Sequence, residues 1–346
     1  MSKWYEKLPS GNENYVSSRI RLTRNLEGQK FPSMLTVPEA TELIGRLTYG
    51  LNDIDEFDGR HYTFSIWDRI NDIEKMAYRE RRIVNGSAAQ SKNPASLIVS
   101  DEEDVSILLN GDDHIRIQYL KAGFDLNGLW KQADAMDDYI NSRFPYAFDE
   151  KYGYLTAFPT NVGTAMRANT VLHLPALSQT KQFGSLMAGL SRFGVTIRGV
   201  YGNGKENWGS LYDVCNSGTL GLSEQDIIDQ VGKIARQLNE HETQAKSDAI
   251  KASRIAKEDT VYKSYGVLRY SRKISRKDAL LYLSSVKEGI DDGIIAPLKS
   301  VNIYALMLGI QPYNLRREAV RPLDDEELDI LRADYIRSNL PEIKEA

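Results

Sequence analysis

The chain has 346 residues, of which 41% are hydrophobic and 27% charged, so it is long enough for one large globular domain and a smaller one. Its formal net charge of −4 argues against a general nucleic-acid binder, a class that is normally basic. The sequence offers no apolar stretch of membrane-spanning length, no signal-peptide core, no partner for Cys215 and no zinc-ligand spacing among its 4 histidines. We therefore expect a cytoplasmic protein without a disulfide, a membrane segment or a nucleic-acid partner.

Residues 15–25 predict the first strand. Strand alternation places Arg19 and Arg21 on one face and Ile20 and Leu22 on the other. Two neighbouring guanidinium groups repel each other unless an anion lies between them. An anion site and the solvated face of an edge strand are both consistent with this segment taken alone.

The next elements predict a sheet of antiparallel hairpins. A helix is expected over residues 37–51, and the region 57–96 has no clear pattern apart from an exposed loop at 85–87. Alternating apolar residues predict three strands, followed by an amphipathic helix over 126–143. These strands span residues 96–100, 105–109 and 115–119. The turn before the third strand carries Asp112, and the strand itself carries Arg116.

Further arginines follow in similar settings. Residues 154–158 predict a strand, 159–164 a polar turn with Arg167 at its exit, and 171–174 a buried strand. After a helix over 182–192, the strand 195–201 carries Arg198. A glycine-containing loop over 202–207 then carries Glu206, and residues 211–214 predict another strand.

From Ser223 onward the pattern is helical. Ser223 and Asp226 form a capping-box signature, and the charged stretch 240–254 is a candidate domain link. Three more helices are expected over residues 277–288, 301–308 and 324–337. The sequence thus predicts an α+β protein with an antiparallel sheet flanked by helices, followed by a helical C-terminal domain. We place the domain boundary after residue 245, so that the two domains span 1–245 and 246–346.

Several arginines and two carboxylate-bearing turns on such a sheet indicate chemistry on a polyanion. Arginine supplies charge and directed donors for phosphate oxygens. Phosphoryl transfer requires positioning, charge neutralisation and a carboxylate that orients or deprotonates the nucleophile. The sequence contains neither a P-loop nor a His-Arg-Asp catalytic loop, which excludes P-loop enzymes and ordinary protein kinases.

Five segments resemble the guanidino phosphotransferases, also called phosphagen kinases. They are S-S-R-I-R-L-T-R-N, N-G-D-D-H-I-R-I, P-T-N-V-G-T-A-M-R-A, I-R-G-V-Y-G and the G-x-x-x-x-V-x-N-S stretch at residues 209–217. Within that family the chain is most similar to the bacterial protein arginine kinases, because it begins almost directly at the arginine pair and has a helical region behind. The resemblance covers nearly the whole chain.

The resemblance implies that the ATP γ-phosphate is transferred to a guanidinium nitrogen of arginine residues in proteins, by a catalytic domain at 1–245. It implies that nucleotide phosphates are held by Arg19, Arg21, Arg116, Arg167 and Arg198. It assigns the catalytic carboxylates to Asp112 and Glu206, with Mg²⁺ carried by the nucleotide and no dedicated metal site. It also implies proteins with exposed arginines as substrates, an activator protein, a Clp-type protease partner, a homodimer and a role in bacterial stress response.

Three departures from the family pattern stand out. The family's N-E-E-D-H reads N-G-D-D-H here, so the catalytic Glu becomes Asp112, one methylene shorter. The family's cysteine before the P-T-N turn is Phe158, while Cys215 replaces a serine and is expected to be a packed core thiol. In the family's R-D-x-x-R-A motif for phosphoarginine, Leu328 replaces the first arginine, which leaves that regulation open.

Two other functions remain consistent with these residues. One is a kinase for free arginine or another small guanidino compound, against which the missing N-terminal helical domain counts. The other is a catalytically weakened pseudokinase adaptor, which Gly111, Asp112 and Phe158 favour.

Overall fold

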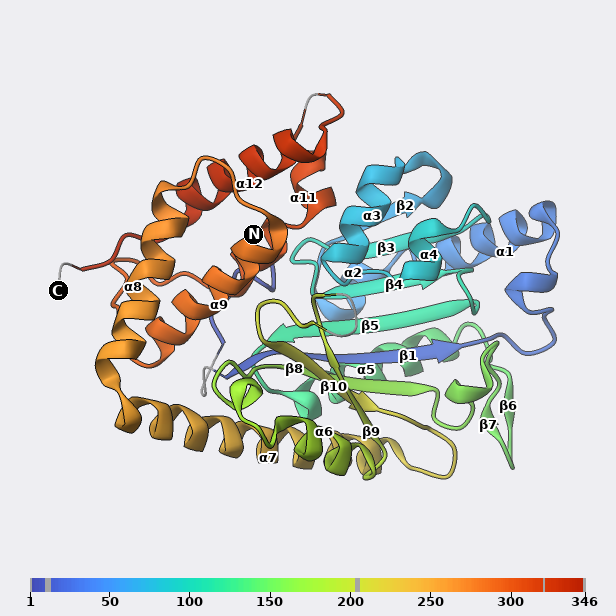
Figure 1. Ribbon diagram of the computed structural model, residues 1–346. Coiled ribbons are helices and arrows are strands. Elements are labelled where there is room, and N and C mark those ends of the chain that lie inside the picture. Colours follow the sequence, from blue (N-terminus) through green and yellow to red (C-terminus); the bar gives the residue numbers. More distant parts are fainter. Residues whose placement is uncertain (1, 10–13, 203–205, 320, 345–346) are drawn as a thin grey trace.

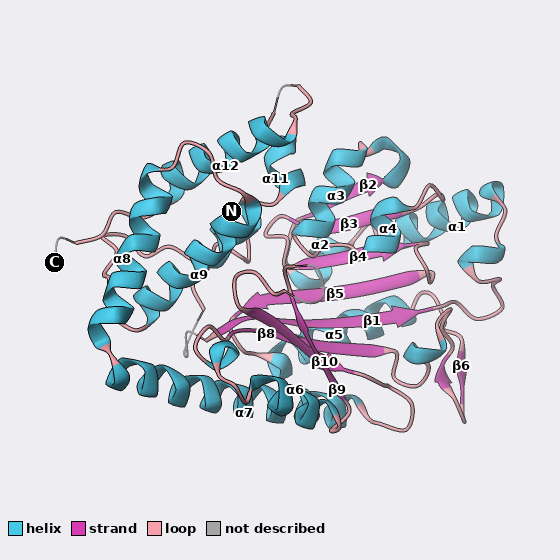
Figure 2. Ribbon diagram, in the orientation of Figure 1, coloured by secondary structure: helices cyan, strands magenta, loops and turns pink. Residues whose placement is uncertain are grey.

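The computed structural model describes residues 2–9, 14–202, 206–319 and 321–344. It confirms the predicted α+β architecture, with an antiparallel sheet flanked by helices and a helical C-terminal region (Figures 1 and 2). Within the described residues the main sheet has 8 strands, which are, in spatial order, β2 (Tyr62–Ile66), β3 (Ser96–Ser100), β4 (Val105–Leu109), β5 (Ile115–Ala122), β1 (Tyr15–Arg24), β8 (Met166–His173), β10 (Leu211–Asn216) and β9 (Val195–Gly199).

A small hairpin and a series of helices complete the described fold. The hairpin pairs β6 (Phe148–Asp149) with β7 (Gly153–Tyr154). The helices are α1 (Val37–Gly50), α2 (Ile54–Asp58), α3 (Asp72–Glu80), α4 (Gly86–Gln90), α5 (Leu126–Asn141), α6 (Phe183–Ser191), α7 (Glu224–Ala252), α8 (Arg254–Tyr270), α9 (Arg276–Asp291), α10 (Ile303–Gly309), α11 (Pro312–Arg317) and α12 (Asp325–Asn339).

The two faces of the sheet are covered differently. Ile20 and Leu22 are fully buried on the face that packs against α1, α5 and α7 (Figure 1). On the opposite face, α3 and α4 cover one part of the sheet through apolar residues of β3 and β4. The C-terminal helices cover another part through Leu120, Val171 and Leu211. The centre of this second face, between the two covers, therefore carries the polar side chains described below.

The helix caps follow the sequence signals. Ser223 accepts a hydrogen bond from the Asp226 amide, and the Asp226 carboxylate accepts one in return, so the predicted capping box begins α7. Helix α7 runs through the predicted boundary after residue 245 and continues to Ala252, where Ser253 caps α8. The division of the chain into domains at residue 245 stays a prediction.

Two local expectations are wrong. Residues 85–87 are not an exposed loop, because Asn85 caps the short helix α4. Residues 154–158 do not form a strand beyond Tyr154, since Thr156 and Ala157 follow a path fixed by side-chain contacts, including an Ala157 amide that donates to Asp113. Both segments also form hydrogen bonds with the turn at Asp112 and Asp113, 25 or more positions away in the sequence, and local periodicity cannot report such contacts.

Candidate active site

Strand register brings the five predicted phosphate-binding arginines to one face of the sheet. Arg21 on β1 lies directly opposite Arg167 on β8, and the neighbouring β1 residue on this face, Thr23, lies opposite Arg116 on β5. Arg198 on β9 faces Asp213 on β10, which belongs to the same face. Five cations from four strands therefore share one surface, although they are spread over 180 residues of sequence.

The described part of the chain supplies no carboxylate partner for these arginines. None of Arg19, Arg21, Arg116, Arg167 and Arg198 forms an ion pair with a carboxylate of the described residues. Among the residues that the structure describes, Arg21 Nε is buried without a hydrogen-bond partner, and Arg19 Nε donates only to Asn169 Oδ1, at 3.4 Å. These two donors are available to an anion that enters from outside. The Arg167 guanidinium, by contrast, donates hydrogen bonds to Asn161 Oδ1 and to the carbonyl oxygens of Asn216 and Thr160, but to no described carboxylate.

Arg24, on the opposite face of the same strand, shows the contrast. Its guanidinium donates two hydrogen bonds to Asp137 on α5, of 3.0 and 2.8 Å, and lies 3.6 Å from the ring centroid of Tyr154. A buried structural arginine in this protein is therefore paired.

The charges of the cluster act on one another. Burial, and then the charges of neighbouring arginines, lower the pKa of Arg19 to about 9 and that of Arg21 to about 10. The same causes lower the pKa of Arg116 well below its usual value. The protonated cluster is thus electrostatically unfavourable when alone, and a polyanion bound at this surface would relieve that cost.

Asp112 lies beside the cluster, in the turn between β4 and β5. Together with Arg21, Arg116 and Phe158 it lines a cavity of about 180 Å³. Its Oδ2 atom accepts hydrogen bonds from Asn85 Nδ2, at 2.9 Å, and from Ser87 Oγ, at 2.7 Å. The structure therefore places one predicted catalytic carboxylate next to the predicted phosphate-binding arginines.

Hydrogen bonds of the next two residues, Asp113 and His114, hold the turn that carries Asp112. The next residue, Asp113, is buried and accepts hydrogen bonds of 2.6 Å from Asn25 Nδ2 and from the Ala157 amide. His114 Nδ1 accepts from the Leu26 amide at 3.0 Å, and Nε2 lies 2.9 Å from the Lys30 carbonyl oxygen, so Nε2 carries the proton. These two side chains hold the turn and leave Asp112 to face the cavity.

Gly111 shows how tightly this turn is packed. A Cβ atom built at Gly111 would lie 2.7 Å from Cδ2 of Leu108, a buried residue of the apolar cluster beneath α4. We expect Gly111→Ala to lower the free energy of unfolding by about 1 kcal/mol, because Leu108 must leave its packed position. Denaturant titration measures the change. Gly45→Ala is the control: its Cβ would meet no atom within 4 Å in α1, so this variant should gain stability.

Glu206 lies apart from this cavity. Its exposed carboxylate accepts hydrogen bonds from Trp208 Nε1, at 3.0 Å, and from Lys277 Nζ of α9, at 2.9 Å. The bond from Trp208, followed by the bond and charge of Lys277, lowers the pKa of Glu206. The structure does not bring Glu206 to the cavity lined by Asp112. Residues 203–205 of the predicted loop lie outside the described residues.

Two residues that the sequence analysis missed connect the cluster to its surroundings. Arg82 Nη2 lies 3.4 Å from Asp213 Oδ1, and Asp213 accepts hydrogen bonds from Asn169, the partner of Arg19. The alternation of Asp213 with buried Val214 could have placed it on the arginine face. Arg82 follows the end of α3 and has a left-handed backbone conformation, with a φ of 68°. Nothing in the local sequence pattern indicates that conformation, so the contact of Arg82 with Asp213 could not be predicted.

The prediction for Cys215 is wrong. Its neighbours in strand register are Asn169 and Thr196 on the arginine face, and its side chain is only partly buried. Burial, followed by the charge of Asp213, raises the pKa of the Cys215 thiol despite the nearby arginines. A thiol at this position therefore belongs to the polar surface of the sheet and not to the apolar core.

In the C-terminal motif at residues 328–333, the remaining arginine forms contacts within the protein. Arg332 is buried; it donates to the carbonyl oxygens of Ile310, at 3.1 Å, and Ile274, at 3.0 Å, and pairs with Asp329. Leu328, which replaces the family's first arginine, is also buried. The remaining arginine of this motif thus joins helices of the C-terminal region.

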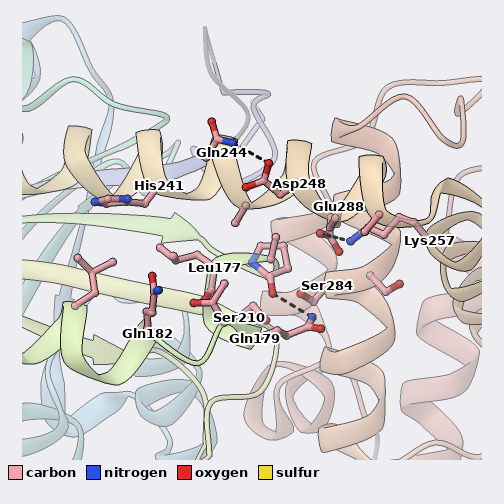
Figure 3. A pocket seen from close by; sticks show the side chains of 18 of the residues that line it. Leu177, Gln179, Gln182, Ser210, His241, Gln244, Asp248, Lys257, Ser284 and Glu288 are labelled. Carbon is pink, nitrogen blue, oxygen red and sulfur yellow. Dashed lines mark hydrogen bonds and ion pairs between the residues drawn. The ribbon is translucent and has the colours of Figure 1, made fainter.

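A larger cavity, of about 1310 Å³, lies between α6, α7, α8 and α9. Its lining includes alanines of α7 and leucines of α6. Glu288 pairs with Lys257 at one side (Figure 3). Asp248 accepts a hydrogen bond from Gln244 on the same helix, at 2.8 Å (Figure 3). This cavity contains none of the five arginines.

Comparison with known sequences shows the family to which the chain belongs. The family described as ATP:guanido phosphotransferase, C-terminal catalytic domain, matches residues 46–245, and the chain belongs to this family. The Protein-arginine kinase McsB C-terminal domain matches residues 254–346. A protein-arginine kinase of Bacillus subtilis is 39% identical over 343 residues, covering 98% of this chain and 93% of that protein. One of Brevibacillus brevis is 36% identical over 340 residues, covering 98% and 95%. Within the class, the chain belongs to the protein-arginine kinases.

Solved structures agree on the fold. Lombricine kinase aligns with a TM-score of 0.59 at 19% identity, covering 71% of this chain and 73% of that one. The duplicated taurocyamine kinase of Schistosoma mansoni, with bound transition state analog components, gives 0.58 at 24% identity. This chain covers 34% of that duplicated protein, and 68% of this chain is aligned.

Proposed function

We propose that this protein transfers the γ-phosphate of ATP to the guanidinium group of arginine residues in other proteins. The observation that carries the proposal is a cluster of five arginines on one face of the sheet, next to Asp112, for which the described residues supply no carboxylate partner. Guanidinium groups that no described carboxylate neutralises fit the oxygens of a triphosphate. A carboxylate beside them fits the guanidinium that is to be phosphorylated.

Each residue has a part in this proposal. Arg19, Arg21, Arg116, Arg167 and Arg198 hold the phosphates and neutralise charge that develops during transfer. Asp112 and Glu206 orient the substrate guanidinium and accept hydrogen bonds from its N–H groups. The described residues contain no group of three or more His, Cys, Asp or Glu side chains arranged for a metal ion. We assign Mg²⁺ to the nucleotide phosphates, because this ion keeps several of its waters and is usually bound together with substrate phosphates.

Proteins with exposed arginines are the proposed substrates, rather than free arginine. Support comes from relatives named protein-arginine kinase that align over 98% of this chain, and from the C-terminal match at residues 254–346. An activator protein, a Clp-type protease partner, a homodimer and a stress-response role belong to the same proposal. Among the described residues, no helix is both long enough and apolar enough to span a membrane.

The direct test is incubation with Mg-ATP and an arginine-rich protein, followed by mass spectrometry for acid-labile phosphate on arginine. Phosphoarginine formation supports the proposal. Phosphorylation of free arginine in preference to the protein would favour a small-molecule kinase, and nucleotide binding without transfer would favour a pseudokinase.

Nucleotide binding gives a separate prediction. Mg-ATP should raise the melting temperature, because the phosphates relieve repulsion within the arginine cluster. Arg167→Ala should abolish most of that rise, which differential scanning fluorimetry measures. Arg143→Ala is the matched control, since Arg143 pairs with Asp53 away from the arginine face. Equal nucleotide-dependent shifts in both variants would contradict the assignment of Arg167.

A further inference from the structure

The N-terminal turn of α4 directs two donors at a single oxygen of Asp112. Asn85 Nδ2 lies 2.9 Å, and Ser87 Oγ 2.7 Å, from Asp112 Oδ2. Asn85 Nδ2 also lies 2.7 Å from Ser87 Oγ, so the three side chains form a closed set of contacts. No hydrogen bond from the described residues reaches Asp112 Oδ1. One oxygen of this carboxylate is therefore held, and the other is available in the cavity.

The two donors are themselves fixed. Asn85 Oδ1 accepts a hydrogen bond of 3.2 Å from the Ala88 amide, so this side chain caps α4 while its amide group holds Asp112. Ala88 and Ala89 pack in the apolar cluster that contains Leu108, just before the Asp112 turn. Helix α4 and the turn are thus positioned against the same strands.

The segment leading into α4 is also tied to the sheet. Gln118 Nε2 donates to the Arg82 carbonyl oxygen at 2.7 Å, and Ser106 Oγ donates to that of Ile83 at 3.1 Å. Both side chains lie on the face of the sheet that carries the arginines. The distance from α4 to Asp112 is therefore set by strands β4 and β5, and not by a free loop.

We infer that Asn85 and Ser87 are positioning residues, which fix the Asp112 carboxylate so that Oδ1 faces the substrate guanidinium. The inference rests on the proposed function. A carboxylate one methylene shorter than glutamate must meet its substrate over a narrow range of positions, and a displacement of about 1 Å can cost about 10²-fold in rate. Two donors on Oδ2 remove the rotation that would turn Oδ1 away.

The test compares Ser87→Ala, which removes one donor, with Asn85→Asp, which keeps an acceptor for the α4 cap but replaces the amide donor by a charge that repels Asp112. We expect kcat for protein-arginine phosphorylation to fall about 10-fold or more in each variant, with nucleotide affinity and melting temperature close to wild type. Ser87→Thr retains a hydroxyl and should recover most of the loss. Asn71→Asp is the matched control, because Asn71 caps α3 in the same way, at a distance from Asp112.

Asp112→Asn is measured in parallel, because it separates the positioning role of Asn85 and Ser87 from the proposed function of Asp112 itself. Wild-type kcat in both Ser87→Ala and Asn85→Asp, with an inactive Asp112→Asn, would overturn the positioning role and leave the proposed function in place. Losses that follow a lowered melting temperature and are not recovered by Ser87→Thr would assign both residues a structural role instead. Full turnover in Asp112→Asn would remove the carboxylate from the mechanism and the inference with it.

Discussion

Glu206→Gln is expected to lower kcat for arginine phosphorylation by about 10²-fold or more, the scale of a lost general base, while nucleotide binding survives. Glutamine keeps the shape of the side chain and removes its charge. In the structure Glu206 is bound to Trp208 and to Lys277 of α9, so it must leave these partners to reach a guanidinium at the arginine face. Single-turnover kinetics and nucleotide titration separate the two effects.

Lys277→Gln is the control that separates loss of the Glu206 carboxylate from loss of its ion pair. It breaks the ion pair between the loop and α9 but leaves the Glu206 carboxylate in place. If Glu206 is catalytic, Lys277→Gln should retain turnover, because the carboxylate is freer to move. Equal losses in Glu206→Gln and Lys277→Gln would show that the ion pair itself matters and that the catalytic base lies elsewhere.

The predictable part of this fold is the part with a regular period or a cap. Alternation along residues 15–25 correctly placed Ile20 and Leu22 on the face opposite the arginines, and the structure buries both. The hairpins that became β3, β4 and β5 pair as expected. The helix expected over residues 277–288 lies within α9, which Ser275 caps. In each case the local pattern and the tertiary structure agree, because one face of the element is buried over its full length.

Region 57–96 could not be predicted, because its elements are too short to show a regular hydrophobic pattern. Its helices are short, and α4 spans only residues 86–90, less than two turns. A segment of that length shows no period, and its place depends on Ser106 and Gln118 of the sheet. The contact between Asn85 and Asp112 joins residues 27 positions apart, so no local signal contains it.

In the candidate site, too, some features could be predicted from the sequence and others depend on the tertiary structure. Family motifs pointed to the five arginines, and alternation put Arg19 and Arg21 on one face. That all five share this face follows only from the register between strands, such as the pairing of Arg21 with Arg167. Arg82 depends on a left-handed backbone conformation that nothing in its sequence neighbourhood indicates.

Asp112→Glu is expected to lower arginine phosphorylation about 10-fold or more, although it restores the residue typical of the family. Asp112 Oδ2 is already held at 2.9 and 2.7 Å by Asn85 and Ser87. An added methylene moves the carboxylate by about 1.5 Å, which either breaks both hydrogen bonds or fills part of the cavity of about 180 Å³ where we propose that the substrate guanidinium binds. Gly111 is part of the same adaptation, since a side chain there would displace Leu108.

Steady-state phosphorylation of an arginine-rich protein measures this effect, with Asp112→Asn setting the level of a lost carboxylate. We expect Asp112→Glu to bind nucleotide as the wild type does, because the five arginines are unchanged, and to fall between wild type and Asp112→Asn in kcat. A double variant Asp112→Glu with Ser87→Ala should lose little more than Asp112→Glu alone, since the longer side chain no longer uses that donor. If Asp112→Glu instead raised kcat, Asp112 would be an impaired substitute for glutamate and the pseudokinase alternative would gain support.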